Sequence, residues 1–150
     1  MENVDIEKII AIISDTVSRG EVFRLNPTGR SMLPTITPGS DSVLLARADN
    51  LKKYDIVLYR RRTGKIILHR IIGFSKGKYV MCGDSQNMIE RIEKDEIIAK
   101  VSGIFKGNDF VPSDDKKYLA RIKRLYIKKS PVLLAFSVKT AVKRLFGIKK

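Results

Sequence analysis

Ser31 lies in a short segment whose residue types suit a catalytic serine: residues 28–35 read Thr-Gly-Arg-Ser-Met-Leu-Pro-Thr. Gly29 lets the backbone approach a ligand closely, and Pro34 disfavours helix at the residue before it, so Ser31 is expected on an extended or turning segment. The α/β-hydrolase nucleophile motif is excluded, because it needs a glycine where this chain has Leu33. Taken alone, the segment is more typical of a surface turn with an exposed serine.

His69 is the single histidine of the chain and lies within an apolar run, residues 66–72. A buried imidazole needs a hydrogen-bond partner, because an unsatisfied buried polar group costs about 1–3 kcal/mol. Ser31 and a backbone carbonyl are both candidate partners. A third polar segment follows the next apolar run, where residues 83–87 read Gly-Asp-Ser-Gln-Asn and Asp84 occupies a turn. Serine, histidine and an acid are the groups of a nucleophilic peptidase site.

The elements that would position these residues form a β-rich middle region, residues 21–115. Short apolar runs alternate with glycine-containing turns, and no long helix separates them. This pattern predicts a mainly β fold, a small antiparallel barrel or sandwich. The expected strands cover residues 43–46, 56–59, 65–72, 78–82 and 97–105.

Helices are expected at both ends of the chain. Residues 1–20 carry isoleucines at helical spacing, which predicts an amphipathic helix that ends at Gly20. Residues 116–150 predict two basic amphipathic helices, the second with Ser130 as its N-cap and Pro131 as its first residue. The predicted apolar stripe of the first helix consists of Ile6, Ile9, Ile10, Ile13 and Val17.

The positive charge is concentrated in the tail. Residues 1–115 carry 18 Lys and Arg against 16 Asp and Glu, whereas residues 116–150 carry 12 Lys and Arg and no acid. Such a block predicts contact with an anionic surface, and the few aromatic residues near its apolar faces favour lipid or protein over nucleic acid. Packing of the tail on the β-domain is the alternative. We expect the peptidase chemistry to need residues 1–115 alone.

The sequence contains no recognisable membrane span or secretory signal. The longest uncharged run near the C-terminus, residues 130–138, is well short of the about 20 residues that a span needs. Glu2, Asp5 and Glu7 stand where a secretory signal carries positive charge. A cytoplasmic protein with a peripheral membrane contact is therefore expected. One His and one Cys exclude a His/Cys zinc site within the chain, and no cofactor is expected.

Taken together and in this order, the three polar segments resemble the signal peptidase clan of serine peptidases, in its Ser-His branch, the archaeal and endoplasmic-reticulum type. Family members carry a Ser-Met-x-Pro-Thr box, here residues 31–35, then an apolar strand with His in place of Lys, here residues 66–72, and later a Gly-Asp box, here residues 83–87. The resemblance covers about residues 25–105. It implies a serine endopeptidase that cleaves a leader or signal-type peptide through an acyl-enzyme.

The resemblance also implies the roles of the central residues. Ser31 would attack the peptide carbonyl, and His69 would act as general base, with activity rising through a pH near neutral. An acid would orient the imidazole. In this branch a second acid follows the Gly-Asp box by about six residues, and here that position holds Glu90 instead of Asp. Asp84 and Glu90 both remain candidates, and the tighter turn around Asp84 favours Asp84.

Further residues around the nucleophile follow from the same resemblance. Backbone N–H groups at Gly29 and Arg30 would bind the oxyanion, and Met32, Leu33 and Ile36 would line the substrate pocket. The family commonly has a serine where this chain has Gly29, and the hydroxyl of that serine helps to bind the oxyanion. In this chain the oxyanion donors would therefore be backbone N–H groups or the hydroxyl of Thr28.

Two other functions fit parts of the sequence. In the first, the β-domain is a non-catalytic scaffold and the basic tail binds an anionic membrane or nucleic acid. The second, a self-cleaving repressor, is disfavoured because only 30 residues precede Ser31, too few for a DNA-binding domain and a cleavable linker. The peptidase is the preferred interpretation.

Overall fold

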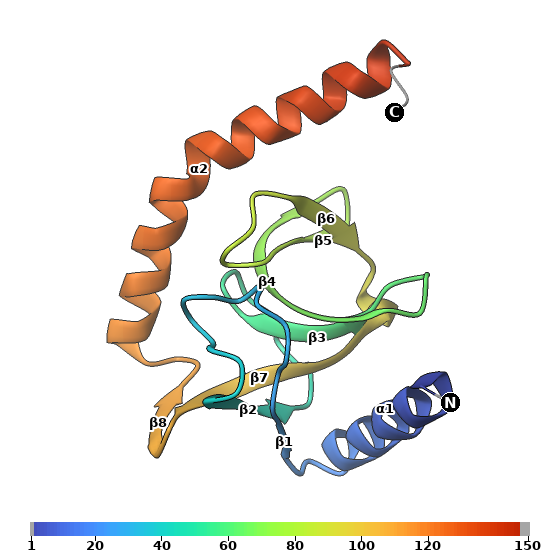
Figure 1. Cartoon of the computed structure of the whole chain (residues 1–150), viewed down its shortest axis with the longest axis vertical. Helices are drawn as coiled ribbons and strands as arrows, with labels where there is room; N and C mark the ends of the chain where they lie inside the picture. The colour runs from blue at the N-terminus through green and yellow to red at the C-terminus, as the bar shows by residue number, and fades with distance from the viewer. Residues whose placement is uncertain (1, 148–150) are drawn as a thin grey trace.

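The computed structural model describes the backbone of residues 2–147 and the side chains of residues 5–135 and 139–147. A β-sheet lies between a helix at each end of the chain (Figure 1). The elements, in chain order, are α1 (Glu2–Ser18), β1 (Phe23–Leu25), β2 (Asp41–Ala46), β3 (Ile56–Arg60), β4 (Ile66–Ser75), β5 (Lys78–Cys82), β6 (Ile89–Ile92), the short 3-10 helix η1 (Lys94–Glu96), β7 (Ile97–Lys106), β8 (Asp109–Pro112) and α2 (Lys116–Leu145).

All eight strands belong to one antiparallel sheet. Its order is β1-β2-β7-β3-β4-β5-β6, and β8 pairs with β7. The sheet curls strongly (Figure 1), but β1 and β6 at its two ends do not pair with each other within residues 2–147. The prediction of a mainly β, antiparallel domain is confirmed, and the sheet stays open where a closed barrel was one of the expected forms.

The five predicted strands are β2, β3, β4, β5 and β7, and each contains most of its predicted residues. β4 continues three residues beyond the predicted end, because a register shift between Ile71 and Gly73 lets it bend and keep pairing with β5. β1, β6 and β8 were not predicted. They have only three or four residues each, too few to give a clear alternation of apolar and polar side chains.

Side chains of the central strands divide between two cores, because successive residues of a strand point to opposite faces. The smaller core contains Val57, Tyr59, Ile71, Met81 and Ile92. The larger core fills the other face and includes side chains from both helices. Neighbouring residues of β4 therefore face different surroundings, which matters for the polar residues of that strand.

The predicted N-terminal helix is present, but only its C-terminal half packs on the sheet. Ile13 and Val17 are 2% and 4% exposed, whereas Ile6 and Ile9 are 41% and 47% exposed. The predicted apolar stripe is therefore half buried and half in solvent.

The tail forms one helix, and the prediction of two helices is wrong. α2 begins after Asp115, whose carboxylate accepts a 2.7 Å hydrogen bond from the Tyr118 N–H, and it continues through Ser130 and Pro131. Proline removes a backbone donor and kinks a helix without necessarily ending it, and Figure 1 shows the axis of α2 changing direction part-way along.

The two halves of α2 differ in packing. The first half buries Tyr118, Ile122 and Tyr126 in the larger core, at 8%, 2% and 6% exposure. The second half runs past the β5–β6 end of the sheet (Figure 1). Neither α1 nor α2, over the residues described, is long and apolar enough to cross a bilayer.

Candidate active site

His69 lies in β4 with the two nitrogens of its ring facing different groups. Its Nδ1 atom is 3.2 Å from Tyr59 Oη and 3.7 Å from Glu90 Oε1. Its Nε2 atom faces Gly83, where an added Cβ would lie 3.1 Å from Nε2 and 2.7 Å from the carbonyl oxygen of Ser31. The imidazole thus lies between the Glu90 carboxylate and the Ser31 segment.

Strand geometry explains why Glu90 rather than Asp84 reaches this imidazole. Glu90 pairs with Met81 of β5, whose side chain packs in the smaller core, on the same face of the sheet as His69. Arg70 follows His69 along β4 and therefore points to the opposite face, where it binds Asp84. The geometry favours Glu90 as the acid beside the histidine, against the preference for Asp84 drawn from the sequence.

Burial and hydrogen bonding set the charges of this pair. Burial lowers the pKa of His69 to about 4, although the nearby Glu90 carboxylate raises it. Burial raises the pKa of Glu90, but hydrogen bonds from Arg61 and Tyr59 outweigh this and hold the pKa below its usual range. Arg61 donates two 2.8 Å hydrogen bonds to the carboxylate. At neutral pH, Glu90 is therefore ionised and His69 is a neutral imidazole.

Ser31 and His69 line the same surface pocket, which has a volume of about 680 Å³. Residues 25–32 form one wall, strands β3 and β4 with their connecting loop form another, and Ser85 and Gln86 complete the lining. Ser31 is half-buried, and within the described residues its hydroxyl makes no hydrogen bond, to His69 or to any other group. The sequence prediction brought these two residues together, and they share one pocket in the structure.

The Ser31 segment is held against the loop after β5. The Ser85 N–H donates a 2.9 Å hydrogen bond to the carbonyl oxygen of Ser31, and the Ser85 hydroxyl donates one of 2.9 Å to the carbonyl oxygen of Arg30. These contacts orient the carbonyls of the segment toward the loop. The backbone N–H groups of Gly29, Arg30 and Ser31 make no hydrogen bond within the described structure, so they are available to a ligand oxygen.

Asp84 is the centre of a second, fully buried network. Its carboxylate receives hydrogen bonds of 2.8 and 2.7 Å from Arg70, and neither side chain has any exposed surface. Thr35 and Tyr126 also donate to it, the latter at 2.6 Å. Burial raises the pKa of Asp84, but the hydrogen bonds and positive charge of Arg70, together with the hydrogen bonds from Thr35 and Tyr126, outweigh burial. The pKa therefore lies below its usual range, and the acid is ionised. Asp84 thus joins the segment after Ser31 to β4 and α2.

A lysine of α2 supports the same loop. Lys129 Nζ donates hydrogen bonds of 3.1 and 2.9 Å to the carbonyl oxygens of Gly83 and Asp84. Tyr118, also on α2, lies 3.1 Å from a guanidinium nitrogen of Arg70. The first half of α2 is therefore part of the framework around the pocket, although the sequence analysis assigned the tail to a separate role.

The three predicted substrate-binding residues have different positions. Met32 is buried and lines the pocket. Ile36 is 1% exposed, lies in the larger core and does not line the pocket, so its assignment to substrate binding is not supported. Leu33 is half-buried and likewise does not line the pocket. Sequence alone could not separate an apolar residue of the pocket from one of the core.

Six residues of the two networks were not predicted from the sequence: Tyr59, Arg61, Arg70, Tyr118, Tyr126 and Lys129. Arg70 carried a signal, because a charged residue in the middle of an apolar strand requires a buried partner. The others carried none, since their roles depend on strand pairing and helix packing. Among the described residues, no group of three or more His, Cys, Asp and Glu side chains could hold a metal ion.

A scan of the sequence against protein-family models gave no match, and a search of curated proteins found no related sequence. The assignment of a function therefore depends on the motifs and on the geometry of the pocket.

Proposed function

We propose that the protein is a serine endopeptidase that resembles the Ser-His signal peptidases and hydrolyses a leader or signal-type peptide. The observation that carries the proposal is that Ser31 and His69 line one pocket, while a carboxylate lies 3.7 Å from the opposite nitrogen of the imidazole. A serine, a neutral imidazole and an ionised acid in that order are the groups that peptide hydrolysis through an acyl-enzyme requires.

The proposed mechanism starts from the tautomer of His69 with its proton on Nδ1. That N–H faces Tyr59 Oη, and the tyrosine hydroxyl donates in turn to Glu90. Nε2 is then an acceptor on the side of Ser31. The Ser31 hydroxyl gives its proton to Nε2 while its oxygen bonds to the peptide carbonyl carbon. The unbonded N–H groups of Gly29, Arg30 and Ser31 are candidate donors to the oxyanion.

The remaining steps return the proton and release both products. The peptide C–N bond breaks, the amine leaves with the proton from Nε2, and the peptide carbonyl stays bonded to Ser31 Oγ. Water then gives a proton to Nε2 and its oxygen to the acyl carbon, and Ser31 leaves with that proton. Glu90 and Tyr59 stabilise the imidazolium that forms in each step. Asp84 positions the Ser31 segment and touches no reacting atom.

Labelling with a fluorophosphonate probe tests the proposal, because such probes bond only to activated serines. We expect wild-type protein to be labelled and Ser31→Ala to remain unlabelled with an unchanged circular dichroism spectrum, since the Ser31 hydroxyl makes no contact that the fold needs. Ser113→Ala is the control, because Ser113 is likewise half-buried but does not line the pocket. Labelling should persist in this control.

Two results would overturn the proposal. One is equal labelling of wild-type protein and Ser31→Ala, which would place the reactive group elsewhere. The other is the absence of labelling in folded wild-type protein, together with no cleavage of peptides that carry small residues before the scissile bond. The second result would favour the alternative function, a β-scaffold that carries a basic binding helix.

A further inference from the structure

From Ile127 onward, α2 leaves a stripe of large apolar side chains in solvent. Ile127, Leu134, Val142 and Leu145 follow one another at intervals of seven, eight and three residues, which places them on one face of the helix. They are 72%, 67%, 43% and 82% exposed. Single exposed apolar residues are ordinary, but several on one helix face indicate a surface that binds a partner.

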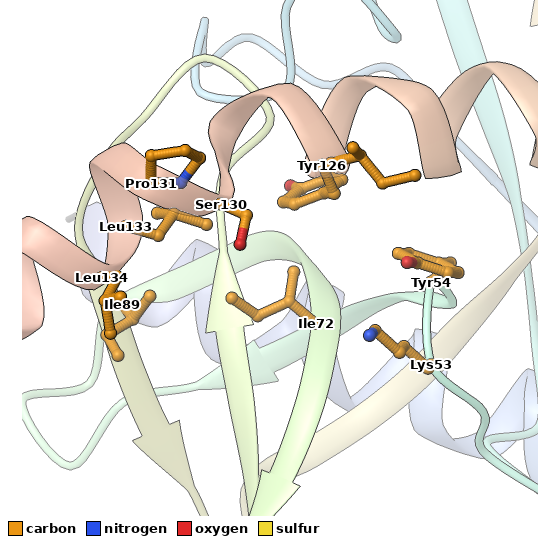
Figure 2. Close-up of a pocket in the computed structure, with 10 residues that line it drawn as sticks. Lys53, Tyr54, Ile72, Ile89, Tyr126, Ser130, Pro131, Leu133 and Leu134 are labelled. Atoms are coloured by element: carbon orange, nitrogen blue, oxygen red, sulfur yellow. The ribbon is translucent and has the colours of Figure 1, made fainter.

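An apolar pocket of about 550 Å³ lies between this part of α2 and the sheet. Figure 2 shows Leu133, Leu134 and Pro131 of the helix on one side and Ile72 and Ile89 of the strands on the other. The charged side chain that lines it belongs to a lysine, Lys53. The stripe therefore continues into an apolar hollow, which has a cation at its edge.

Positive charge borders the stripe. Lys128, Lys139, Lys143 and Arg144 occupy positions beside it on the helix, and residues 116–150 contain no acid. A second pocket, between the end of α2 and strands β4–β6, is lined by Arg144 and by three further cations, Lys76, Lys78 and Arg91, of which Lys78 pairs with Glu93. The partner of this surface must therefore offer apolar contact and negative charge together.

We infer that the second half of α2 docks on an anionic lipid surface, with the apolar stripe among the acyl chains and the flanking lysines at the headgroups. A membrane supplies both features along the whole length of the helix. A nucleic acid would neutralise the lysines but would leave the apolar stripe in water. The inference rests on the surface of α2 and is independent of the proposed peptidase activity.

Co-sedimentation of the full chain with vesicles tests the inference. Vesicles of equal parts phosphatidylglycerol and phosphatidylcholine should bind the protein at low salt, whereas phosphatidylcholine vesicles should not. Raising the salt to about 0.5 M should weaken binding, because headgroup attraction is screened within about a Debye length. The Leu134→Gln/Leu145→Gln variant should bind at least about tenfold more weakly.

Matched variants separate the stripe from general hydrophobicity and charge. Ile9→Gln/Ile12→Gln removes two exposed apolar side chains from α1, which lies at the other end of the molecule (Figure 1), and should bind as wild type does. Lys139→Glu/Lys143→Glu should lose binding. Lys52→Glu/Arg62→Glu makes the same change of net charge on exposed residues of the loops before and after β3, and this variant should keep most of the binding.

Three results would overturn the inference. They are no binding to anionic vesicles at low salt, equal binding by the leucine variant and the wild type, and equal losses in the α1 and α2 variants. Tight binding of single-stranded RNA that the lysine variant loses and the leucine variant keeps would assign the surface to nucleic acid instead. Circular dichroism of each variant checks the fold, and serine labelling of the same samples reports on the peptidase proposal separately.

Discussion

Tyr126 on α2 donates a 2.6 Å hydrogen bond to Asp84, the buried acid in the loop that faces Ser31. Lys129 holds the carbonyls of the same loop, and Tyr118 contacts the guanidinium that pairs with Asp84. The basic helix α2 therefore has two parts with different structural roles. Its first half is a component of the pocket framework, and its second half is a largely exposed amphipathic surface.

Two truncations should separate these halves. A chain that ends at Asp115 should fail to fold, because it loses the buried Tyr118, Ile122 and Tyr126 and leaves the Arg70–Asp84 pair short of partners. This expectation replaces the one drawn from the sequence, that residues 1–115 suffice. A chain that ends at Ala135 should keep the fold and the labelling of Ser31 but lose vesicle binding. Thermal unfolding followed by circular dichroism measures whether each of the two truncated chains folds.

The two acids should give different losses when they are neutralised. Asp84→Asn removes the partner of a buried arginine and should lower the free energy of unfolding by about 3–5 kcal/mol. Glu90→Gln changes a partly exposed group and should cost about 1 kcal/mol or less. It should nevertheless slow probe labelling by at least about tenfold, because the imidazolium loses its carboxylate. Urea unfolding and labelling rates measure the two effects.

A reversal of this pattern would reassign the acid. If Asp84→Asn slowed labelling of fully folded protein more than Glu90→Gln did, Asp84 would be the orienting group, as its turn context in the sequence suggests. Tyr59→Phe tests the connection between His69 and Glu90, because it removes the hydroxyl between these two residues while keeping the buried ring.

The sequence predicted the long strands because each is an apolar run between turn residues. Its motifs also led us to expect Ser31 and His69 in one site, and both residues line one pocket. The sequence favoured Asp84 over Glu90 because of the turn around Asp84, whereas in the structure Glu90 lies beside the imidazole. That placement depends on the pairing of β6 with β5, and β6 is four residues long and partly charged. The prediction of two tail helices failed because Ser130-Pro131 matches a helix start locally, whereas the chain continues a helix already packed on the core.

The labelling rate should rise at a lower pH than the sequence led us to expect. The base must be neutral, and burial lowers the pKa of His69 to about 4, so the rate should increase through about pH 4 and be level by about pH 6. In Glu90→Gln the rise should move to still lower pH, because the carboxylate that raises the His69 pKa is absent. Labelling rates from pH 3.5 to 8 measure the curve.

Acid unfolding must be separated from this titration. The unfolded chain binds a proton at His69 below about pH 6.5 and the folded chain only below about pH 4, so stability falls as the pH drops through this interval. Each rate is therefore divided by the folded fraction measured at the same pH. A corrected rate that still rises through pH 6.5–7 would contradict the buried, neutral state of His69 described above.

Two glycines near Ser31 should respond differently to the same substitution. Gly83 faces both residues of the proposed catalytic pair: an added Cβ would lie 2.7 Å from the Ser31 carbonyl oxygen and 3.1 Å from His69 Nε2. The first contact is with backbone and cannot be relieved by rotation of a side chain, so Gly83→Ala must displace the Ser31 segment. We expect labelling to fall at least about a hundredfold, because small misplacement of a catalytic group has a large effect on rate.

Gly29→Ala is the matched control for this prediction. An added Cβ at Gly29 meets nothing within 4 Å, and the residue does not adopt the left-handed backbone conformation. Its proposed role is carried by its N–H, which alanine retains, so labelling should stay within about threefold of wild type. Equal losses of labelling in Gly29→Ala and Gly83→Ala would mean that Gly29 is needed because it lets a ligand approach the backbone closely, and not because its N–H is a donor. Full labelling of Gly83→Ala would show that the contact between the Gly83 loop and the Ser31 segment does not position the nucleophile, and the geometric basis of the proposed site would fail.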